Sequence, residues 1–258
     1  MGYDYENFKQ DIYKLTNINL SLYKERQMKR RIESLMQRKG YHNFKDYYQA
    51  MVSDDKLLRS FVSYLTINVS EFYRNPKQWE LFEQKMIPYL TKEYGTSLNI
   101  WSAACSTGDE PYTIAMILAK HLPLNKIHIL ATDIDEDVLQ YAKEGYYLAR
   151  SLERLPKEFL NTHFTKKDKG YQINDNIKAC VEFKKHNLLE DKYPSGMHMI
   201  VCRNVVIYFT DEAKNKVYQN FYKSLVKDGV LFIGSTEQII HAKDIGFQST
   251  DSFFYQKI

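Results

Sequence analysis

The first third of the chain is patterned for helices. Apolar residues recur there every three or four positions in three groups: Phe8, Ile12 and Leu15; Met28, Ile32, Leu35 and Met36; and Leu57, Leu58, Phe61, Val62 and Leu65. This spacing places each group on one face of a helix, and Gly40 suits the end of the second helix. No strand-like run interrupts residues 1 to about 92, so this part is expected to be all-helical.

From Leu98 onward, short apolar runs alternate with amphipathic helices. The runs cover residues 98–104, 127–132, 180–183, 197–202, 230–234 and 253–256, and two of the helices cover residues 114–122 and 217–225. This alternation predicts an α/β domain with a parallel sheet covered on both faces. A ligand is then expected beyond the carboxyl ends of the strands. The polar segment 157–178 is expected to form a small insertion.

Composition narrows the class of protein. The hydrophobic fraction of 44% and the aromatic fraction of 14% are those of a folded globular protein. No apolar run reaches the roughly 18 residues that would suggest a membrane span, and the N-terminus lacks the features of a signal peptide. We therefore expect a cytoplasmic protein without membrane insertion. Its three cysteines, which lack CxxC spacing, are expected to be reduced and buried, with no metal site.

The first predicted strand runs into a loop of small residues, Cys105-Ser106-Thr107-Gly108, and then into a helix. Such a loop lets a nucleotide-like cofactor approach main-chain N–H groups. The loop is neither GxGxxG nor a phosphate-binding loop with GK[ST], so binding of NAD or ATP loses support. A structural alternative for Glu110 is a capping box with Thr107.

The second predicted strand ends in acidic residues that could hold a ribose. Asp133 is well placed to accept both hydroxyls of an adenosine, as in dinucleotide sites. Alternatively, Asp133 and Asp135 cap the helix that begins near Val138. We expect Asp135 to act as the cap and Asp133 to contact the ribose.

Four segments together resemble one family, the chemoreceptor glutamate methyltransferases of the CheR type. They are Asn68-Val69-Ser70-Glu71-Phe72-Tyr73-Arg74, residues 101–112, residues 131–135, and Cys202-Arg203-Asn204-Val205-Val206-Ile207-Tyr208-Phe209. The resemblance implies a class I fold that binds S-adenosylmethionine (SAM), with a doubly wound, mainly parallel sheet. It also implies an N-terminal all-helical domain over 1–75 that faces the receptor, and a methyltransferase domain over 76–258 that contains the insertion at about 157–178.

The resemblance also implies roles for individual residues. The residues expected to contact the cofactor are Asn68, Ser70, Arg74, Glu110, Asp133, Asn187, Leu188, Arg203 and Asn204. Arg74 and Tyr208 are expected to face the incoming glutamate as catalytic residues. Ser70 stands where family members often have Thr. The segment Gly234-Ser235-Thr236-Glu237 departs from the more usual Gly-His-Ser-Glu, so Glu237 is assigned no role.

The implied chemistry suits these residues. A glutamate carboxylate, with a reference pKa near 4.3, is already ionised at neutral pH, so methyl transfer to it needs no general base. Arg74 can orient a carboxylate with its planar fork, and Tyr208 can donate one hydrogen bond. The structural alternatives are a surface salt bridge for Arg74 and a packed aromatic ring for Tyr208.

The excess positive charge lies in the N-terminal third. Residues 1–75 hold 13 Lys and Arg against 9 Asp and Glu, and the remainder holds 23 of each. Many of these cations lie on the second predicted helix. They are Lys24, Arg26, Lys29, Arg30, Arg31 and Arg38, and Lys39 follows them. This is either a solvated helix face or a surface that attracts an acidic partner. Beside a CheR-type core we expect that partner to be a receptor, and neutralising Arg31 and Arg38 should raise the KM for it.

The leading hypothesis is therefore SAM-dependent methylation of glutamates on the cytoplasmic helical region of transmembrane chemotaxis receptors, for sensory adaptation. The product would be S-adenosylhomocysteine, and the chain is expected to act as a monomer without nucleic acid. Two alternatives are a SAM-dependent methyltransferase acting on nucleic acid or a small molecule, and a non-catalytic SAM-sensing or scaffold module. The Asp/Asn-Pro-Pro-aromatic sequence of amine-modifying enzymes does not follow the fourth strand, so base methylation is the weaker hypothesis.

Overall fold

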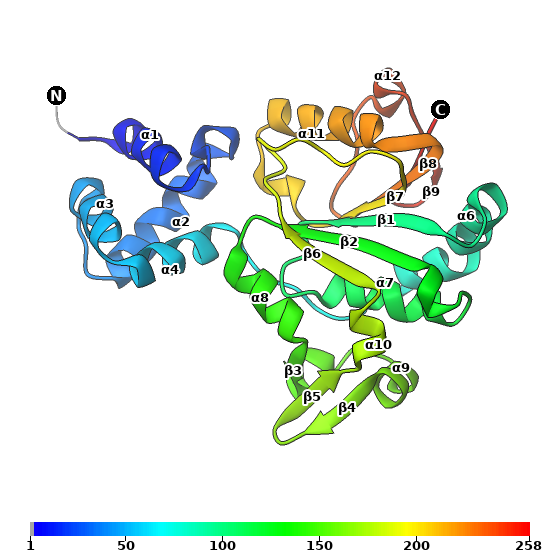
Figure 1. The fold of residues 1–258 in the computed structure, drawn as a ribbon. Helices are drawn as coiled ribbons and strands as arrows, with labels where there is room; N and C mark the ends of the chain where they lie inside the picture. The colour runs from blue at the N-terminus through cyan, green and yellow to red at the C-terminus, as the bar shows by residue number, and fades with distance from the viewer. Residues whose placement is uncertain (1–2) are drawn as a thin grey trace. The chain divides into compact units, whose positions relative to one another are not determined.

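The computed structural model describes residues 3–258, which divide into two compact units (Figure 1). The helical unit contains the described residues up to Asn68 together with Val205–Val217. The sheet unit contains Val69–Asn204 and Tyr218–Ile258. The chain thus leaves the sheet unit after Asn204 and returns at Tyr218. The sequence placed the main boundary near residue 75, and the division after Asn68 lies seven residues earlier.

The helical unit is built on helices whose apolar faces meet. Its N-terminal part contains α1 (Tyr5–Thr16), η1 (Leu20–Leu22), α2 (Glu25–Arg38), α3 (Phe44–Ser53) and α4 (Asp55–Leu65). The rings of Phe8, Tyr47 and Phe61 pack together and are fully buried. Side chains cap several helix starts: Asp4 accepts from the N–H of Asn7, and Asp54 from that of Leu57. The three helices predicted from periodicity are confirmed.

The returning segment is tied to the start of α2. It contains the turn η5 (Val206–Tyr208) and the first half of α11 (Asp211–Ser224). The N–H of Lys24 donates to the carbonyl of Tyr208 at 2.9 Å, and the N–H of Thr210 donates to the carbonyl of Leu22 at 2.9 Å. The ring of Tyr23 packs edge-on against that of Phe209 at 5.2 Å. Residues 22–24 and 208–210 therefore form a short antiparallel ladder.

Within residues 3–258, the strands of the sheet unit form one seven-stranded and one three-stranded sheet. The large sheet has the order β6-β2-β1-β7-β8-β10-β9. Its strands are β1 (Leu98–Ala103), β2 (Ile127–Asp133), β6 (Val181–Lys185), β7 (Met197–Cys202), β8 (Leu225–Ile233), β9 (Phe247–Asp251) and β10 (Phe254–Lys257). The first five in this order pair in parallel, and β10 pairs antiparallel with both neighbours. The predicted mainly parallel sheet is confirmed.

Helices lie against this sheet (Figure 1). Before β1, α5 (Pro76–Leu81), the π-helical turn η2 (Phe82–Met86) and α6 (Ile87–Tyr94) follow one another directly. The π turn comes just before Pro88, which has no N–H to donate to the preceding turn. After β1 come α7 (Asp109–Ala119), η3 (Leu124–Lys126) and α8 (Glu136–Glu144), and α12 (Ala242–Ile245) precedes β9.

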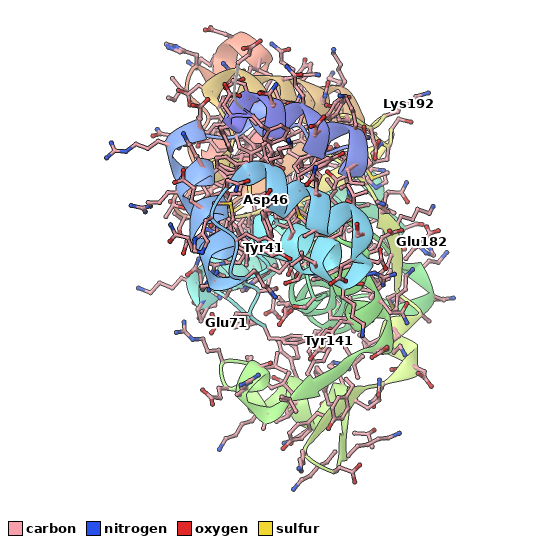
Figure 2. All side chains as sticks on the ribbon, turned by 90° about the vertical axis from the view of Figure 1, so that its left-hand side faces the viewer. Tyr41, Asp46, Glu71, Tyr141, Glu182 and Lys192 are labelled. Carbon is pink, nitrogen blue, oxygen red and sulfur yellow. The ribbon has the colours of Figure 1, made fainter. Side chains whose placement is uncertain are left out.

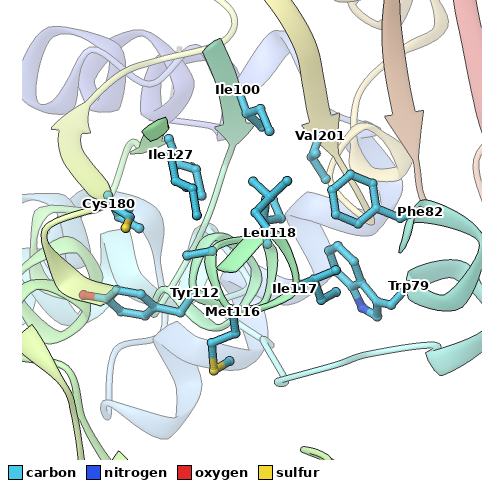
Figure 3. Packing of buried hydrophobic residues seen from close by; sticks show 14 of the residues in the cluster. Trp79, Phe82, Ile100, Tyr112, Met116, Ile117, Leu118, Ile127, Cys180 and Val201 are labelled. Carbon is cyan, nitrogen blue, oxygen red and sulfur yellow. The ribbon is translucent and has the colours of Figure 1, made fainter. Parts of the chain in front are cut away.

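The main core lies between α7 and the sheet. Every residue from Pro111 to Leu118 is buried, as expected for a helix that is apolar on all sides. Figure 3 shows Ile117 and Leu118 of α7 beside Trp79, Phe82 and Val201. Each such large apolar side chain contributes about 1.5–3 kcal/mol when fully buried. On the other sheet face, Trp101 packs edge-on against Phe221 of α11 at 5.5 Å.

The inserted subdomain is the three-stranded sheet with its helices. It contains β3 (Tyr146–Leu148), η4 (Ala149–Leu152), α9 (Lys157–His163), β4 (Phe164–Lys167), β5 (Gly170–Ile173) and α10 (Asp175–Lys178). It therefore begins before residue 157, where the sequence placed its start. The hydroxyl of Tyr147 on β3 donates to the carbonyl of Thr107 at 2.7 Å. This bond anchors the subdomain to the loop after β1.

Two charged residues near the edge of the large sheet are exposed (Figure 2). They are Glu182 on the edge strand β6 and Lys192 on the loop after it.

The cysteines Cys105, Cys180 and Cys202 are buried and form no disulfide, as predicted. No helix in the described part of the chain combines the length and the apolar character needed to cross a membrane.

Candidate active site

The loop after β1 has an unusual backbone. Ala104, Ser106 and Gly108 all have positive φ angles, of 63°, 49° and 88°. Only glycine tolerates this region freely, and such conformations gather at ligand sites. A Cβ on Gly108 would also lie 2.9 Å from the Cβ of Ala142 and 3.0 Å from the hydroxyl of Tyr147. The loop can therefore keep its path only with glycine at this position.

Asp133 at the end of β2 supports this loop. One carboxylate oxygen accepts from the N–H of Ser106 at 2.8 Å, and the other accepts from the N–H of Asp135 at 3.0 Å. Burial raises the pKa of Asp133 to about 6, although these hydrogen bonds oppose the shift. The N–H of Ile134 also hydrogen-bonds to this carboxylate, and of its roughly four lone pairs one remains for a further donor. As predicted, Asp135 caps α8 by accepting from the N–H of Asp137.

Glu110 in the first turn of α7 faces a buried guanidinium. Its Oε1 accepts from the hydroxyl of Ser102 at 2.9 Å, and its Oε2 lies 3.5 Å from Nη1 of Arg203. Burial raises the pKa of Glu110, and the positive charge of Arg203 opposes the rise. The capping-box alternative is wrong, because Gly108 is the N-cap of α7 and no side chain caps the helix.

Arg203, directly after β7, makes both hydrogen bonds and cation–π contacts within the site. Its Nη2 donates to the carbonyl of Arg74 at 2.9 Å and to Oε1 of Gln78 at 2.5 Å. Its guanidinium also lies 4.8 Å from the ring centre of Trp79 and 5.0 Å from that of Phe232. Such contacts favour arginine over lysine. Arg203 therefore joins the end of β7 to the first turn of α7 and to residues 74–78.

The segment before α5 carries Ser70 and Arg74. The hydroxyl of Ser70 hydrogen-bonds to the buried carboxylate of Asp109, which also accepts from the hydroxyl of Thr107 at 2.5 Å. Burial raises the pKa of Asp109, and both hydroxyl bonds oppose the rise. The side chain of Arg74 is half-buried and its Nη1 donates to the carbonyl of Val69 at 3.4 Å. Ser70 is therefore joined through Asp109 to Thr107 in the loop after β1. Its predicted contact with the cofactor stays a prediction.

Asn187 and Leu188 follow β6, next to β2 in the sheet. The N–H of the preceding residue, His186, donates to the carbonyl of Asp133 at 2.9 Å. Asn187 is buried and its side-chain oxygen accepts from the N–H of Leu189 at 3.0 Å. These two residues are therefore fixed beside Asp133.

The remaining predicted residues belong to the helical unit. Asn68 donates to the carbonyl and hydroxyl of Ser63, both at 3.4 Å. Tyr208 is half-buried, and its carbonyl accepts from Lys24. Their cofactor and substrate contacts stay predictions. So do the receptor contacts of α2, on which Lys24, Arg26, Arg30 and Arg38 are exposed while Lys29 and Arg31 are half-buried.

Sequence reasoning missed several residues of this site. Gln78, Ser102 and Asp109 hold the predicted residues in place, and Glu237 accepts from the N–H of Asn204 at 2.8 Å. Asp109 lies within a motif that the sequence already singled out. Glu237 lies in the segment 234–237, and no role is assigned to it from the sequence because that segment departs from the usual Gly-His-Ser-Glu. Gln78 lies in a segment without such a signal.

The cluster has polar atoms that suit a polar cofactor. Within residues 3–258, Ser106 Oγ, Arg203 Nε and Asn204 Oδ1 are buried without a protein hydrogen-bond partner. Buried polar atoms are normally satisfied, so hydroxyl, carboxylate and ammonium groups of a ligand fit here. In the same described range, no group of three or more His, Cys, Asp or Glu side chains is arranged to hold a metal ion.

Two family models match nearly the whole chain. The model described as CheR methyltransferase, all-alpha domain matches residues 3–66, and that described as CheR methyltransferase, SAM binding domain matches residues 68–253. The chain belongs to the CheR methyltransferase family. The cluster at the strand ends therefore lies in a SAM-binding domain, and the expected family and fold are confirmed.

Curated CheR relatives agree with this assignment. A chemotaxis protein methyltransferase from Listeria monocytogenes is 41% identical over 254 residues, covering 98% of this chain and 97% of the relative. One from Borreliella burgdorferi is 34% identical and covers 92% of this chain and 88% of the relative. A solved TehB-like SAM-dependent methyltransferase from Corynebacterium glutamicum has a TM-score of 0.40 at 14% identity, covering 70% of this chain and 92% of that one.

Proposed function

We propose that this chain transfers a methyl group from SAM to glutamate side chains on the cytoplasmic helical region of transmembrane chemotaxis receptors. The observation that carries the proposal is the cluster at the carboxyl ends of the parallel strands, which consists of buried Asp133 and Arg203 and the half-buried Glu110. It lies where ligands of such sheets bind, in a chain whose relatives are named chemotaxis protein methyltransferases.

Each residue of the cluster has a role in holding the cofactor. Asp133 accepts the ribose hydroxyls, while Asn187 and Leu188 border the adenine. Glu110 acts near the amino-acid end of the cofactor. Ser70, Arg74, Arg203 and Asn204 make further contacts with it, and Asn68 of the helical unit stays a predicted contact. SAM, when bound, supplies an electrophilic methyl group on a sulfonium. The protein contributes mainly alignment, because the substrate oxygen must lie about 3–3.5 Å from the methyl carbon.

Arg74 and Tyr208 orient the substrate. The glutamate arrives ionised, so these residues need only position it and replace its water. The guanidinium of Arg74 can bind a carboxylate through two parallel N–H groups. Its main-chain carbonyl is fixed by Arg203, which limits the freedom of the segment that carries it. Too tight a hold on the carboxylate would stabilise the ground state and slow transfer, so a positioning role suits Arg74 best.

The partner is expected to meet the basic face of α2. Lys24, Arg26, Arg30 and Arg38 present exposed cations, which can attract an acidic helical receptor over a distance of about 8–10 Å at physiological salt. Lys29 and Arg31 contribute less, because both are half-buried. Arg31 donates to the carbonyl of Tyr64 at 2.7 Å and so also joins α2 to α4.

One experiment tests the reaction and the substrate class together. The purified chain is incubated with SAM labelled in its methyl group, receptor-containing membranes, and RNA or DNA. We expect label on receptor protein that mild base releases as methanol, which identifies a carboxyl methyl ester. Label on nucleic acid, or no transfer by a chain that binds SAM, would refute the proposal.

A further inference from the structure

The turn after β8 places a buried carboxylate against the predicted cofactor residues. Glu237 is 7% exposed. Its Oε2 accepts from the N–H of Asn204 at 2.8 Å and from the N–H of Gly234 at 2.7 Å. A single oxygen atom therefore joins the chain after β7 to the chain after β8.

The chain at Gly234 is shaped for this contact. A Cβ at Gly234 would lie 2.7 Å from Oε2 of Glu237 and 2.8 Å from the main-chain nitrogen of Asn204. Both distances are too short for a carbon atom, so any side chain here would push the carboxylate or the strand end away. Glycine is required at this position by the close approach and not by its φ angle.

Asn204 needs such a restraint. Its φ of 61° is in the left-handed region, which costs free energy for a residue with a side chain. A charge-assisted hydrogen bond to its N–H stabilises the conformation. The neighbouring Arg203 projects into the buried cluster with Glu110, and the charge of Glu237 acts on both of them. The turn also reaches the other side of the site, because Asn75 donates to the hydroxyl of Ser235 at 3.5 Å.

We propose that Glu237 is a positioning residue for methyl transfer, which holds the main chain of Asn204 so that Arg203 and Asn204 meet the cofactor in one orientation. The inference deepens the proposed function, on which it rests for the role of these two residues. As a positioning residue, Glu237 does not touch the reacting atoms. Its main effect comes through the two hydrogen bonds, and its charge, which also acts on Arg203 and Glu110, contributes less.

Two substitutions separate these contributions. Glu237→Ala removes both hydrogen bonds, whereas Glu237→Gln keeps an amide oxygen that can accept both N–H groups. We expect Glu237→Ala to weaken binding of SAM and of S-adenosylhomocysteine by at least about tenfold in calorimetry. It should also lower kcat at saturating SAM and leave the KM for receptor unchanged. Glu237→Gln should stay within about threefold of the wild-type values for all three.

A matched control removes a different partly buried carboxylate. Glu83 accepts from Lys120 at 2.6 Å and from His121 at 3.0 Å, at the opposite end of α7 from Glu110. Glu83→Ala should lower the Tm but leave the Kd for SAM within about twofold, which separates a loss of stability from a loss of positioning.

Three results would overturn the proposal: unchanged SAM affinity and kcat in folded Glu237→Ala, equal damage from Glu237→Gln, or an equal loss of affinity in Glu83→Ala. Should Glu237→Ala fail to fold, Gly234→Ala tests the same contact by steric displacement, and wild-type affinity in that variant would also overturn it. Because SAM binding is measured without receptor, failure of wild-type enzyme to methylate receptors would refute only the proposed function.

Discussion

At the end of β2, the carboxylate of Asp133 lies buried between the N–H groups of Ser106 and Asp135. Its pKa of about 6 is above the unfolded value, so the folded chain binds a proton more readily than the unfolded chain. The stabilising effect of that proton is complete below about pH 4 and is lost as the pH rises through 6. At neutral pH the ionised Asp133 thus lowers stability, as functional carboxylates often do.

The protonation of Asp133 predicts a pH dependence of cofactor binding. Ribose hydroxyls need an acceptor, and a protonated carboxyl has less capacity to accept. We expect the Kd for SAM to rise about tenfold between pH 7 and pH 5, measured by calorimetry. Asp133→Ala should bind SAM weakly with little change over this range. A constant Kd for the wild-type chain would argue against the ribose role of Asp133.

Residue-level prediction from sequence succeeded where one local segment carried the signal. Asp135 is adjacent to the helix that it caps, and Gly108 lies in the loop that the sequence singled out. The partners of Arg203 could not be found in this way, because Gln78 and Glu110 lie 125 and 93 positions away along the chain. The bond between Glu237 and Asn204 likewise spans 33 positions. Such contacts depend on which strand ends meet.

At the scale of elements, the hydrogen bond between the start of α2 and η5 can be tested by removing its single N–H donor. The N–H of Lys24 donates to the carbonyl of Tyr208, and the φ of Lys24 is −59°, which proline also adopts. Lys24→Pro therefore removes the donor with little backbone strain. We expect Lys24→Pro to lower kcat for receptor methylation about tenfold or more, while SAM binding stays unchanged.

Lys24→Ala is the control for this change, since it removes the same side chain but keeps the N–H. Its kcat should equal that of the wild-type enzyme. An equal kcat in the two variants would show that this hydrogen bond does not help to position Tyr208.

The cations of α2 predict a second result at this scale. Arg26 and Arg30 are exposed, so reversing their charge should leave the fold intact. We expect Arg26→Glu with Arg30→Glu to raise the KM for receptor at low salt and to leave kcat nearly unchanged, with the difference shrinking at high salt. Kinetics at two ionic strengths measure this. If the KM of the double variant equals that of the wild type at low salt, α2 does not contact the receptor.

Helices and strands with a clear apolar pattern could be predicted from the sequence. The other elements could not, and the reasons are physical. The predicted range 197–202 coincides with β7, because the last four residues of this central strand are apolar and buried on both faces. β9 escaped prediction because its residues are mostly exposed and polar. The inserted subdomain was recognised only from Lys157, because the three residues of β3 are too few to show a period.

At the scale of the whole molecule, the two units cannot be defined by a single boundary in the sequence, because the chain returns to the helical unit. Val205–Val217 belongs to the helical unit although it lies between two strands of the sheet unit. Periodicity cannot reveal this, because the ladder between residues 22–24 and 208–210 joins positions far apart in the chain.

This path predicts how the protein behaves when it is cut. A protease site inserted at the exposed Val69 would separate residues 1–68 from the rest of the backbone. We expect the two pieces to co-elute in gel filtration under native conditions, because the ladder and the ring contact between Tyr23 and Phe209 hold them together. Urea should release the smaller piece. Separate elution without denaturant would contradict the assignment of Val205–Val217 to the helical unit.

The same path sets a condition for building chimeras between relatives. Exchanging residues 1–68 alone would place foreign helices against the resident segment Val205–Val217. Residues 22–24 of the donor would then have to pair with residues 208–210 of the recipient. A donor relative must therefore supply both pieces of sequence for its specificity to be transplanted as a working module.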